Sequence, residues 1–394
     1  MKAVAWHGSR DVRVDDVPDP RIKEPTDAIV RITSTAICGS DLHLYGVLGS
    51  FLDEGDILGH EPIGIVEDVG SEAAGHLKRG DRVVVPFTIS CGHCWMCERG
   101  RYAQCETTQT RDYDTGAALF GYTKMYGQVP GAQAEYLRVP MANFGPVRVP
   151  HGPPDERFLY LSDILPTAWQ AVEYANIPPG GSVTVFGLGP VGQFAARIAR
   201  YHGARVIGVD YVAERREMAL RHGIEVLDPG GYDDVPAAIR ALTTGRGTDS
   251  VIDAVGMEAH GSPGTEMARK LVGLLPDLAA RKLMESAGVD RLQVLTHCAE
   301  TVARGGTISV SGVYGGTADP LNMLQLFDKG VTIAMGQAHV RRWTGDILPL
   351  VSGDDDPLGV EDLCTHRLPL TDAPRGYEIY QKKLDKCVKV VLQP

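Results

Sequence analysis

Four closely spaced cysteines constrain this chain more than any other feature. They follow the pattern C-x2-C-x2-C-x7-C at Cys91, Cys94, Cys97 and Cys105. No apolar periodicity separates them, so the segment predicts a turn-rich lobe. Zinc prefers soft ligands in a tetrahedral arrangement, with sulfur about 2.3 Å from the metal. Because four thiolates leave no position for water or substrate, the spacing predicts a structural zinc site.

The alternative is a group of free or disulfide-bonded cysteines. Disulfides belong mainly to oxidising compartments, whereas residues 1–8 lack the apolar core of a signal peptide. No apolar run reaches the roughly 18 residues of a membrane span. The other cysteines are scattered along the chain, at Cys38, Cys298, Cys364 and Cys387. We therefore expect a cytoplasmic protein whose thiols bind metal or pack in the core.

Length and charge narrow the class of protein further. The 394 residues suggest about two domains, because one hydrophobic core seldom grows beyond about 250–300 residues. The formal net charge of −11 argues against non-specific nucleic-acid binding. We expect neither a nucleic acid nor a membrane as partner.

The sequence changes in character along its length. Up to about residue 155 it predicts short strands and loops, typical of an antiparallel β domain. The pattern changes near Asp163. A helix is predicted over 161–176, broken by Pro166, and alternating strands and helices follow it. This alternation predicts a doubly wound parallel sheet. The expected strands of the first part are residues 1–6, 12–14, 27–34 and 132–139, together with strands that follow glycine turns within 58–66 and 78–86. Those of the second part are residues 182–186, 205–210, 225–228, 250–255 and 306–310.

Two later segments stand apart from this alternation. Residues 257–297 form an insertion longer than a normal connection. Helical spacing within it is shared by Leu271, Leu274, Leu275 and Leu278. The strand-like residues 387–392 are expected to rejoin the first domain.

A glycine fingerprint lies between the predicted strand 182–186 and the helix 193–202. It reads Gly187, Leu188, Gly189, Pro190, Val191, Gly192. Asp210 follows 23 positions after Gly187, at the end of the next strand. This context predicts a dinucleotide site, in which the helix N-terminus receives the pyrophosphate. Asp210 would accept from the adenosine ribose and repel a 2′-phosphate, which favours NAD, although Arg215 and Arg216 lie nearby.

Two single residues suggest a second metal. Cys38 and His60 each sit in a glycine-flanked turn beside a carboxylate, Asp41 and Glu61 respectively. A catalytic zinc needs three protein ligands and an open position. A buried cysteine or a lone histidine is more often a packing residue, and spacing alone does not join these two.

Along the chain, the Cys38 and His60 turns come first, then the four-cysteine lobe and then the glycine fingerprint. This order resembles that of the zinc-dependent medium-chain alcohol dehydrogenases over nearly the whole chain. The segments 161–168 and 312–316, and the insertion after Gly256, are similar to the glutathione-independent formaldehyde dehydrogenase-like branch. The resemblance implies a Rossmann-type doubly wound sheet plus a GroES-like catalytic domain. It places the catalytic domain at 1–163, the NAD-binding domain at 164–338 and a return to the catalytic domain at 339–394.

The resemblance also assigns roles to residues. It implies that Cys38, His60 and Asp163 hold a catalytic zinc; the family's common third ligand is cysteine, whereas this branch has aspartate. Local sequence equally allows Asp163 to be a helix N-cap. By the same resemblance, Ser40 accepts the substrate proton and passes it through the cofactor ribose to His43.

Several roles stay open at this stage. Glu61 could tune the metal's charge or ligate it transiently. Gly39 departs from well-known members, which carry a cationic residue there. The insertion could cover the adenosine end of NAD, build a subunit interface or be a solvated helical excursion. Asp253, at a strand end, could be only a cap.

The sequence thus predicts an NAD-dependent enzyme with a structural and a catalytic zinc, acting on an alcohol or aldehyde as a homodimer or homotetramer. The alternatives are a polyol dehydrogenase and a non-catalytic protein that binds zinc and nucleotide. Aromatic candidates for the substrate pocket, for which ordinary packing is the other interpretation, are Phe87, Trp95, Phe120, Tyr122 and Trp343.

Overall fold

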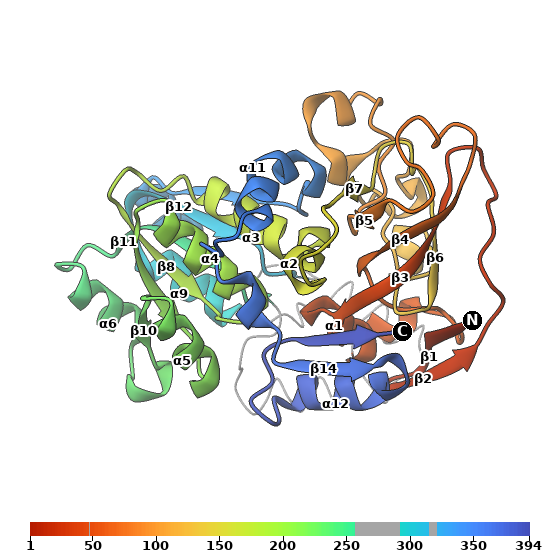
Figure 1. Ribbon diagram of the computed structural model, residues 1–394. Helices are drawn as coiled ribbons and strands as arrows, with labels where there is room; N and C mark the ends of the chain where they lie inside the picture. The colour runs from red at the N-terminus through yellow and green to blue at the C-terminus, as the bar shows by residue number, and fades with distance from the viewer. Residues whose placement is uncertain (47, 257–291, 315–320) are drawn as a thin grey trace. The chain divides into compact units, whose positions relative to one another are not determined.

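The computed structural model describes residues 1–46, 48–256, 292–314 and 321–394 (Figure 1). The chain separates into two compact units. Unit 1 contains residues 1–166 and 338–394, and unit 2 contains residues 167–337. The predicted fold class, a doubly wound parallel sheet and a separate β-rich domain, is confirmed.

Unit 1 is built on a seven-stranded sheet with the order β14-β15-β3-β4-β5-β7, and β6 also pairs with β3. A separate two-stranded sheet joins β1 (Lys2–Gly8) to β2 (Asp11–Asp16). The strands of the larger sheet are β3 (Ala28–Ile37), β4 (Glu61–Val69), β5 (Arg82–Val84), β6 (Tyr136–Val139), β7 (Val147–Arg148), β14 (His366–Pro369) and β15 (Val390–Gln393).

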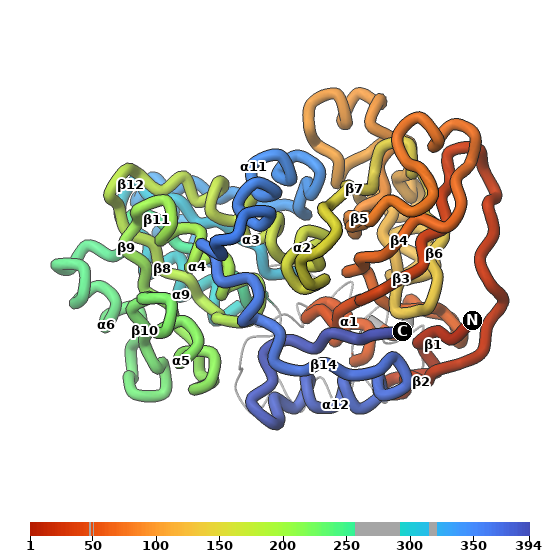
Figure 2. The backbone as a smooth tube through the Cα atoms, in the orientation of Figure 1, coloured from red at the N-terminus to blue at the C-terminus, as the bar shows by residue number. Residues whose placement is uncertain are grey.

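The two ends of the chain meet in this sheet. Strand β15 pairs antiparallel with β3, with Val390 opposite Ile37, and the blue C-terminal segment accordingly lies beside the red N-terminal strands in Figure 2. The pairing of β14 with β15 is parallel, an exception to the predicted antiparallel pattern. Strand β3 has hydrogen-bonded neighbours on both sides, and most of its side chains are buried.

The described part of unit 1 also contains α-helices. They are α1 (Gly39–Gly46), α2 (Glu156–Leu159), α11 (Val340–Ser352) and α12 (Ala373–Lys382). Two of them, α2 and α12, contact strands of the larger sheet. The 3-10 helices are Leu48–Phe51, Cys97–Arg99, Tyr102–Gln104, Arg111–Tyr113, Lys124–Tyr126, Tyr160–Ser162, Val360–Leu363 and Leu370–Asp372. Helix α3 (Ile164–Ala175) spans the unit boundary in sequence.

The break predicted at Pro166 is wrong. Helix α3 begins at Ile164, so Pro166 stands in its first turn. The amide groups of a first turn have no intrahelical acceptor, and proline costs the helix no hydrogen bond there.

Unit 2 contains a six-stranded sheet, all parallel, with the order β10-β9-β8-β11-β12-β13. Its strands are β8 (Ser182–Phe186), β9 (Arg205–Val209), β10 (Glu225–Leu227), β11 (Thr248–Asp253), β12 (Val302–Val310) and β13 (Thr332–Met335). Its described helices are α4 (Pro190–Tyr201), α5 (Ala213–Arg221), α6 (Val235–Leu242), α9 (Gln293–Thr301), α10 (Met323–Lys329) and the 3-10 helix Pro229–Gly231.

Helices of unit 2 cover both faces of this sheet. Helix α4 contacts α5, and α6 contacts α9. Right-handed crossovers place these two pairs on opposite faces, because the direction of strand addition reverses between β8 and β11. The helix predicted around Leu271–Leu278 lies outside the described residues. Helix α9 overlaps only the end of the predicted insertion.

Candidate metal centres and dinucleotide-binding loop

The four cysteines of the lobe converge on one point. Their sulfur atoms all lie within 4.8 Å of one another. Cys91 Sγ is 4.0 Å from Cys97 Sγ, and Cys94 Sγ is 3.9 Å from Cys105 Sγ. Thiolates bound at about 2.3 Å to a tetrahedral zinc ion lie about 3.8 Å apart. The separations therefore fit zinc, whereas a disulfide brings two sulfurs to about 2.05 Å.

Local backbone geometry shapes this lobe. Gly92 has φ +80°, and a Cβ at this position would lie 2.4 Å from the Phe144 ring, so glycine is needed there. The amide of Cys94 donates to Cys91 Sγ at 3.3 Å. Burial opposes the Cys94 thiolate, but backbone hydrogen bonds outweigh it and lower the pKa of this thiol to about 6. Burial raises the pKa of Cys97, so a bound cation is needed to hold four thiolates together.

Cys38, His60 and Asp163 form the second cluster. Cys38 follows β3 and His60 precedes β4, and these strands pair antiparallel with Ala36 opposite Glu61. The C-terminal end of β3 and the N-terminal end of β4 therefore lie next to each other. Asp163 joins them from the link between the 3-10 helix Tyr160–Ser162 and α3.

The distances within this cluster are short. Asp163 Oδ2 lies 3.3 Å from Cys38 Sγ and 3.4 Å from His60 Nε2. All three ligand atoms lie within 4.8 Å of one another, and all three residues are buried. Thiolate, imidazole and carboxylate together form a donor set that zinc accepts, and three protein ligands leave a position open. The residues present therefore fit a catalytic zinc.

The electrostatics of the cluster also suit a cation. Burial and the charge of Asp163 raise the pKa of Cys38 to about 11. Despite burial, the charge of Asp41 raises the pKa of His60. Metal ligands must be deprotonated, so a metal binds here in exchange for protons.

Asp41 orients His60. Asp41 Oδ1 lies 3.1 Å from His60 Nδ1, which turns Nε2 toward Asp163. Asp41 Oδ2 accepts from the Cys38 amide at 2.9 Å and from Gln133 Nε2 at 3.1 Å. The hydroxyl of Tyr377 donates to Gln133 Oε1 at 2.8 Å. Sequence reasoning found Asp41 but missed Gln133 and Tyr377, for which no local signal exists.

Ser40 and His43 lie on α1 beside this cluster. Ser40 Oγ is 3.1 Å from His60 Nε2. His43 is one turn further along the helix and is buried. Ser40 thus contacts the cluster directly through its hydroxyl.

Glu61 follows His60 and pairs with a lysine that sequence reasoning missed. Lys389 Nζ lies 2.5 Å from Glu61 Oε2, and both side chains are fully buried. The available signal was a single lysine in the otherwise apolar segment 387–392.

Two of the predicted pocket aromatics border the cluster. The ring centroids of Phe87 and Tyr122 lie 6.2 and 6.4 Å from that of His60. Trp95 is instead exposed beneath Arg99. Phe120 packs in the core of the sheet, and Trp343 is buried on α11.

The glycine fingerprint forms the loop between β8 and α4. Gly187 has φ +84°, and a Cβ on Gly192 would lie 1.8 Å from Gly187 O. Gly189 is the N-cap of α4, with Pro190 at the start of the helix and Val191 after it. A Cβ on Gly189 would meet only the Arg215 guanidinium, at 3.7 Å. The loop therefore offers amide groups and an open approach to a pyrophosphate.

Asp210 follows β9 and faces this loop. Its Oδ2 accepts from the Leu188 amide at 2.7 Å. Arg215 Nη1 lies 3.6 Å from the same oxygen, and Arg216 Nη2 is held 2.6 Å from Asp228 Oδ2. The carboxylate is thus held beside the glycine loop by the Leu188 amide and Arg215.

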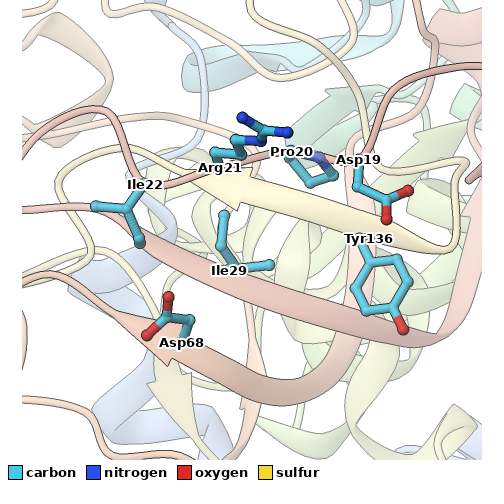
Figure 3. Close-up of a pocket in the computed structure, with 7 residues that line it drawn as sticks. All are labelled: Asp19, Pro20, Arg21, Ile22, Ile29, Asp68 and Tyr136. Carbon is cyan, nitrogen blue, oxygen red and sulfur yellow. The ribbon is translucent and has the colours of Figure 1, made fainter.

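A surface pocket of about 390 Å³ contains no residue of either cluster in its lining (Figure 3). It is lined by Asp19, Pro20, Arg21, Ile22, Ile29, Asp68 and Tyr136. None of these is a predicted site residue, and Asp19 already binds the N-terminal ammonium at 2.8 Å, so we do not regard this pocket as the active site. Among the described residues, no helix is long and apolar enough to cross a membrane.

Sequence comparison identifies the class that this fold and these clusters define. Residues 24–150 match the alcohol dehydrogenase GroES-like domain. Residues 190–271 match the zinc-binding dehydrogenase family. The two units thus correspond to the two parts of a zinc-binding medium-chain dehydrogenase.

Full-length relatives define the family more closely. The zinc-type alcohol dehydrogenase-like protein AdhB of Bacillus subtilis is 40% identical, over 100% of both chains. The glutathione-independent formaldehyde dehydrogenase of Pseudomonas aeruginosa is 31% identical over 100% of this chain and 97% of its own. The solved alcohol dehydrogenase TADH from Thermus sp. ATN1 has 33% identity and a TM-score of 0.82, with 100% of both chains covered. The chain belongs to the zinc-type alcohol dehydrogenase family and is similar to its formaldehyde dehydrogenase-like branch.

Proposed function

We propose that this chain is an NAD-dependent dehydrogenase that oxidises a small alcohol or an aldehyde hydrate, in the manner of a formaldehyde dehydrogenase. The observation that carries the proposal is the buried cluster of Cys38, His60 and Asp163, with the Ser40 hydroxyl 3.1 Å from His60 Nε2. Zinc bound there would supply a Lewis acid for an alcohol or carbonyl oxygen, and a nicotinamide dinucleotide would supply the hydride acceptor.

The residues around the cluster support this chemistry. Oxidation of an alcohol releases one hydride and one proton, and the Ser40 hydroxyl, 3.1 Å from His60 Nε2, would accept and relay that proton. Phe87 and Tyr122 present apolar rings beside His60, which exclude water and favour a small substrate. Asp41 holds the imidazole in a fixed orientation through Nδ1.

Asp210 supports NAD over NADP. Its carboxylate, fixed by the Leu188 amide, would accept from a ribose hydroxyl and repel a 2′-phosphate. Arg216 could bind such a phosphate, but Asp228 Oδ2 and the backbone oxygen of Asp210 already hold its guanidinium.

A polyol dehydrogenase is the alternative within the family, and a non-catalytic zinc and nucleotide-binding protein is the alternative outside it. The test combines zinc analysis with NADH formation from formaldehyde, short primary alcohols and polyols. We expect about two zinc ions per chain, one for each cluster, and turnover with NAD rather than NADP. Turnover of polyols alone would favour the first alternative, and one zinc ion with no NADH formed would favour the second.

The variant His60→Ala tests the assignment of His60 as a metal ligand. We expect it to abolish NADH formation and to lower the zinc content by about one ion per chain, while circular dichroism shows the wild-type fold. Activity that survives this change would contradict the assignment of His60.

A further inference from the structure

Asp253, the last residue of β11, connects two turns at the carboxyl edge of the parallel sheet. Its side chain is fully buried. Oδ1 accepts from the amides of Val255 at 2.9 Å and Gly256 at 3.0 Å. Oδ2 accepts from the phenol of Tyr314, in the turn after β12, at 2.5 Å. One carboxylate therefore joins the turn after β11 to the turn after β12.

The backbone strengthens this connection. The carbonyl oxygen of Asp253 accepts from the amides of Ser311 and Gly312, each at 2.9 Å. A Cβ on Gly312 would lie 2.2 Å from Gly256 N, and a Cβ on Gly256 would lie 2.5 Å from Val313 N. The two turns are thus packed backbone to backbone around Asp253.

The first of these turns also contacts the glycine fingerprint. A Cβ on Gly187 would lie 2.5 Å from Val255 Cγ2, and the Ala254 amide donates to Phe186 O at 2.9 Å. The turn after β11 therefore packs against the start of the glycine loop, on the side of β8 away from Asp210.

Sheet order indicates which half of a dinucleotide these turns serve. Dinucleotides bind across the point where strand order reverses, with the acidic residue after the second strand on the adenosine ribose. Asp210, after β9, marks that side. Strands β11 and β12 lie on the other side of β8, so the turns that follow them face the nicotinamide half.

The carboxylate does more than a strand cap requires. Capping needs only the two amides of its own turn, whereas Tyr314 belongs to a different turn 61 residues away in sequence. Burial raises the pKa of Asp253, and the Tyr314 phenol is the strongest of the hydrogen bonds that lower it.

We propose that Asp253 and Tyr314 are positioning residues that hold the turns after β11 and β12 in the arrangement that receives the nicotinamide half of the cofactor. This proposal rests on the proposed function, because it requires that the chain bind NAD.

The test measures binding of NADH and of ADP-ribose by titration, for the wild type and three variants. Tyr314→Phe removes the phenol alone. Asp253→Asn keeps the link, because its amide accepts from the turn and can donate to the phenol oxygen. Thr248→Val is the matched control, since it removes a buried hydroxyl that donates to Ser250 O at 2.8 Å, at the opposite end of β11.

We expect Tyr314→Phe to weaken NADH binding about tenfold, the size of one hydrogen bond to a charged group. ADP-ribose binding should change less than about twofold, and Asp253→Asn should bind NADH within about threefold of the wild type. Thr248→Val should lower the melting temperature without changing the affinity for either ligand.

Each other outcome overturns the proposal. If Tyr314→Phe binds NADH as the wild type does, the pair does not position the cofactor, and the proposed function stands. If Tyr314→Phe weakens NADH and ADP-ribose equally, its role is structural. If the wild type binds neither ligand, the pair and the NAD dependence both fail.

Discussion

The ammonium group of Lys389 lies 2.5 Å from the carboxylate of Glu61, and neither side chain has any exposed surface. Lys389 immediately precedes β15, and Glu61 begins β4 directly after His60. Burial disfavours the charged lysine, but the negative charge of Glu61 outweighs it and raises the pKa of Lys389. The pair therefore links the C-terminal segment to the residue next to a candidate metal ligand.

Lys389→Met should destabilise unit 1. The change leaves the Glu61 carboxylate buried without its partner, and breaking such a pair costs about 3–5 kcal/mol. Urea denaturation of the zinc-loaded protein measures the loss. The double variant with Glu61→Gln removes the stranded charge and should recover most of the stability. A Lys389→Met variant as stable as the wild type would show that the pair contributes nothing.

Cys97→Ser should release the structural zinc and spare the other cluster. A serine oxygen is a poor substitute for a thiolate in a tetrahedral sulfur site, so the zinc content should fall by about one ion per chain. The melting temperature should drop, because a metal that binds only the folded state stabilises it. The folded fraction should still form NADH at a rate per folded chain near that of the wild type. Zinc retained at the wild-type level would contradict the structural assignment.

His7 should make stability depend on pH. Its Nε2 lies 2.7 Å from Asp15 Oδ2 and its Nδ1 lies 3.0 Å from Glu54 Oε1. The hydrogen bond to Asp15 is the main cause that raises the pKa of His7, with Glu54 adding to it and nearby Arg13 opposing it. A raised folded-state pKa gives stability that is complete below the unfolded pKa of about 6.5 and is lost as pH rises through the folded value.

Urea denaturation at about pH 5.5 and about pH 9 checks this dependence. His7→Asn should be more destabilising at the lower pH, where the wild type holds an imidazolium between two carboxylates. Asp15→Asn is the control and should reduce the difference between the two conditions. An equal effect of His7→Asn at both values would mean that the ring acts through packing alone.

Sites built from residues close together in sequence were predictable from local patterns, whereas sites built from distant residues were not. The thiol lobe is local, so spacing alone predicted its four ligands, and their sulfur separations now fit zinc. The glycine loop was likewise predicted from its position between a strand and a helix. Cys38, His60 and Asp163 required the family resemblance, because only the register of β3 with β4 brings the first two together.

Neither local patterns nor the family resemblance indicated the residues that contact Asp41 and Glu61. Gln133 contacts Asp41 across 92 residues of sequence, and Lys389 contacts Glu61 across 328. Such contacts arise from tertiary packing and leave no periodic signal. Asp253 was considered only as a cap because its second partner, Tyr314, lies on another turn. The helix break predicted at Pro166 is wrong because local propensity does not show at which residue a helix begins.

The edge of the parallel sheet in unit 2 carries exposed apolar side chains. Strand β13 has one hydrogen-bonded neighbour, β12, among the described strands. Met335 on this strand is 63% exposed, and Phe327 on α10 is 83% exposed. An unpaired apolar edge of this kind favours pairing with another chain.

A second copy of this chain is the partner we propose for that edge, because a strand that pairs antiparallel with itself across a two-fold axis buries the same surface on both copies. Phe327→Glu combined with Met335→Glu should place like charges within the contact and convert a dimer to a monomer. Sedimentation equilibrium measures the mass. Leu242→Glu, on an exposed position of α6 (47% exposed), is the control and should leave the mass unchanged. A wild-type chain that sediments as a monomer, or a double variant that keeps the wild-type mass, would contradict pairing through β13.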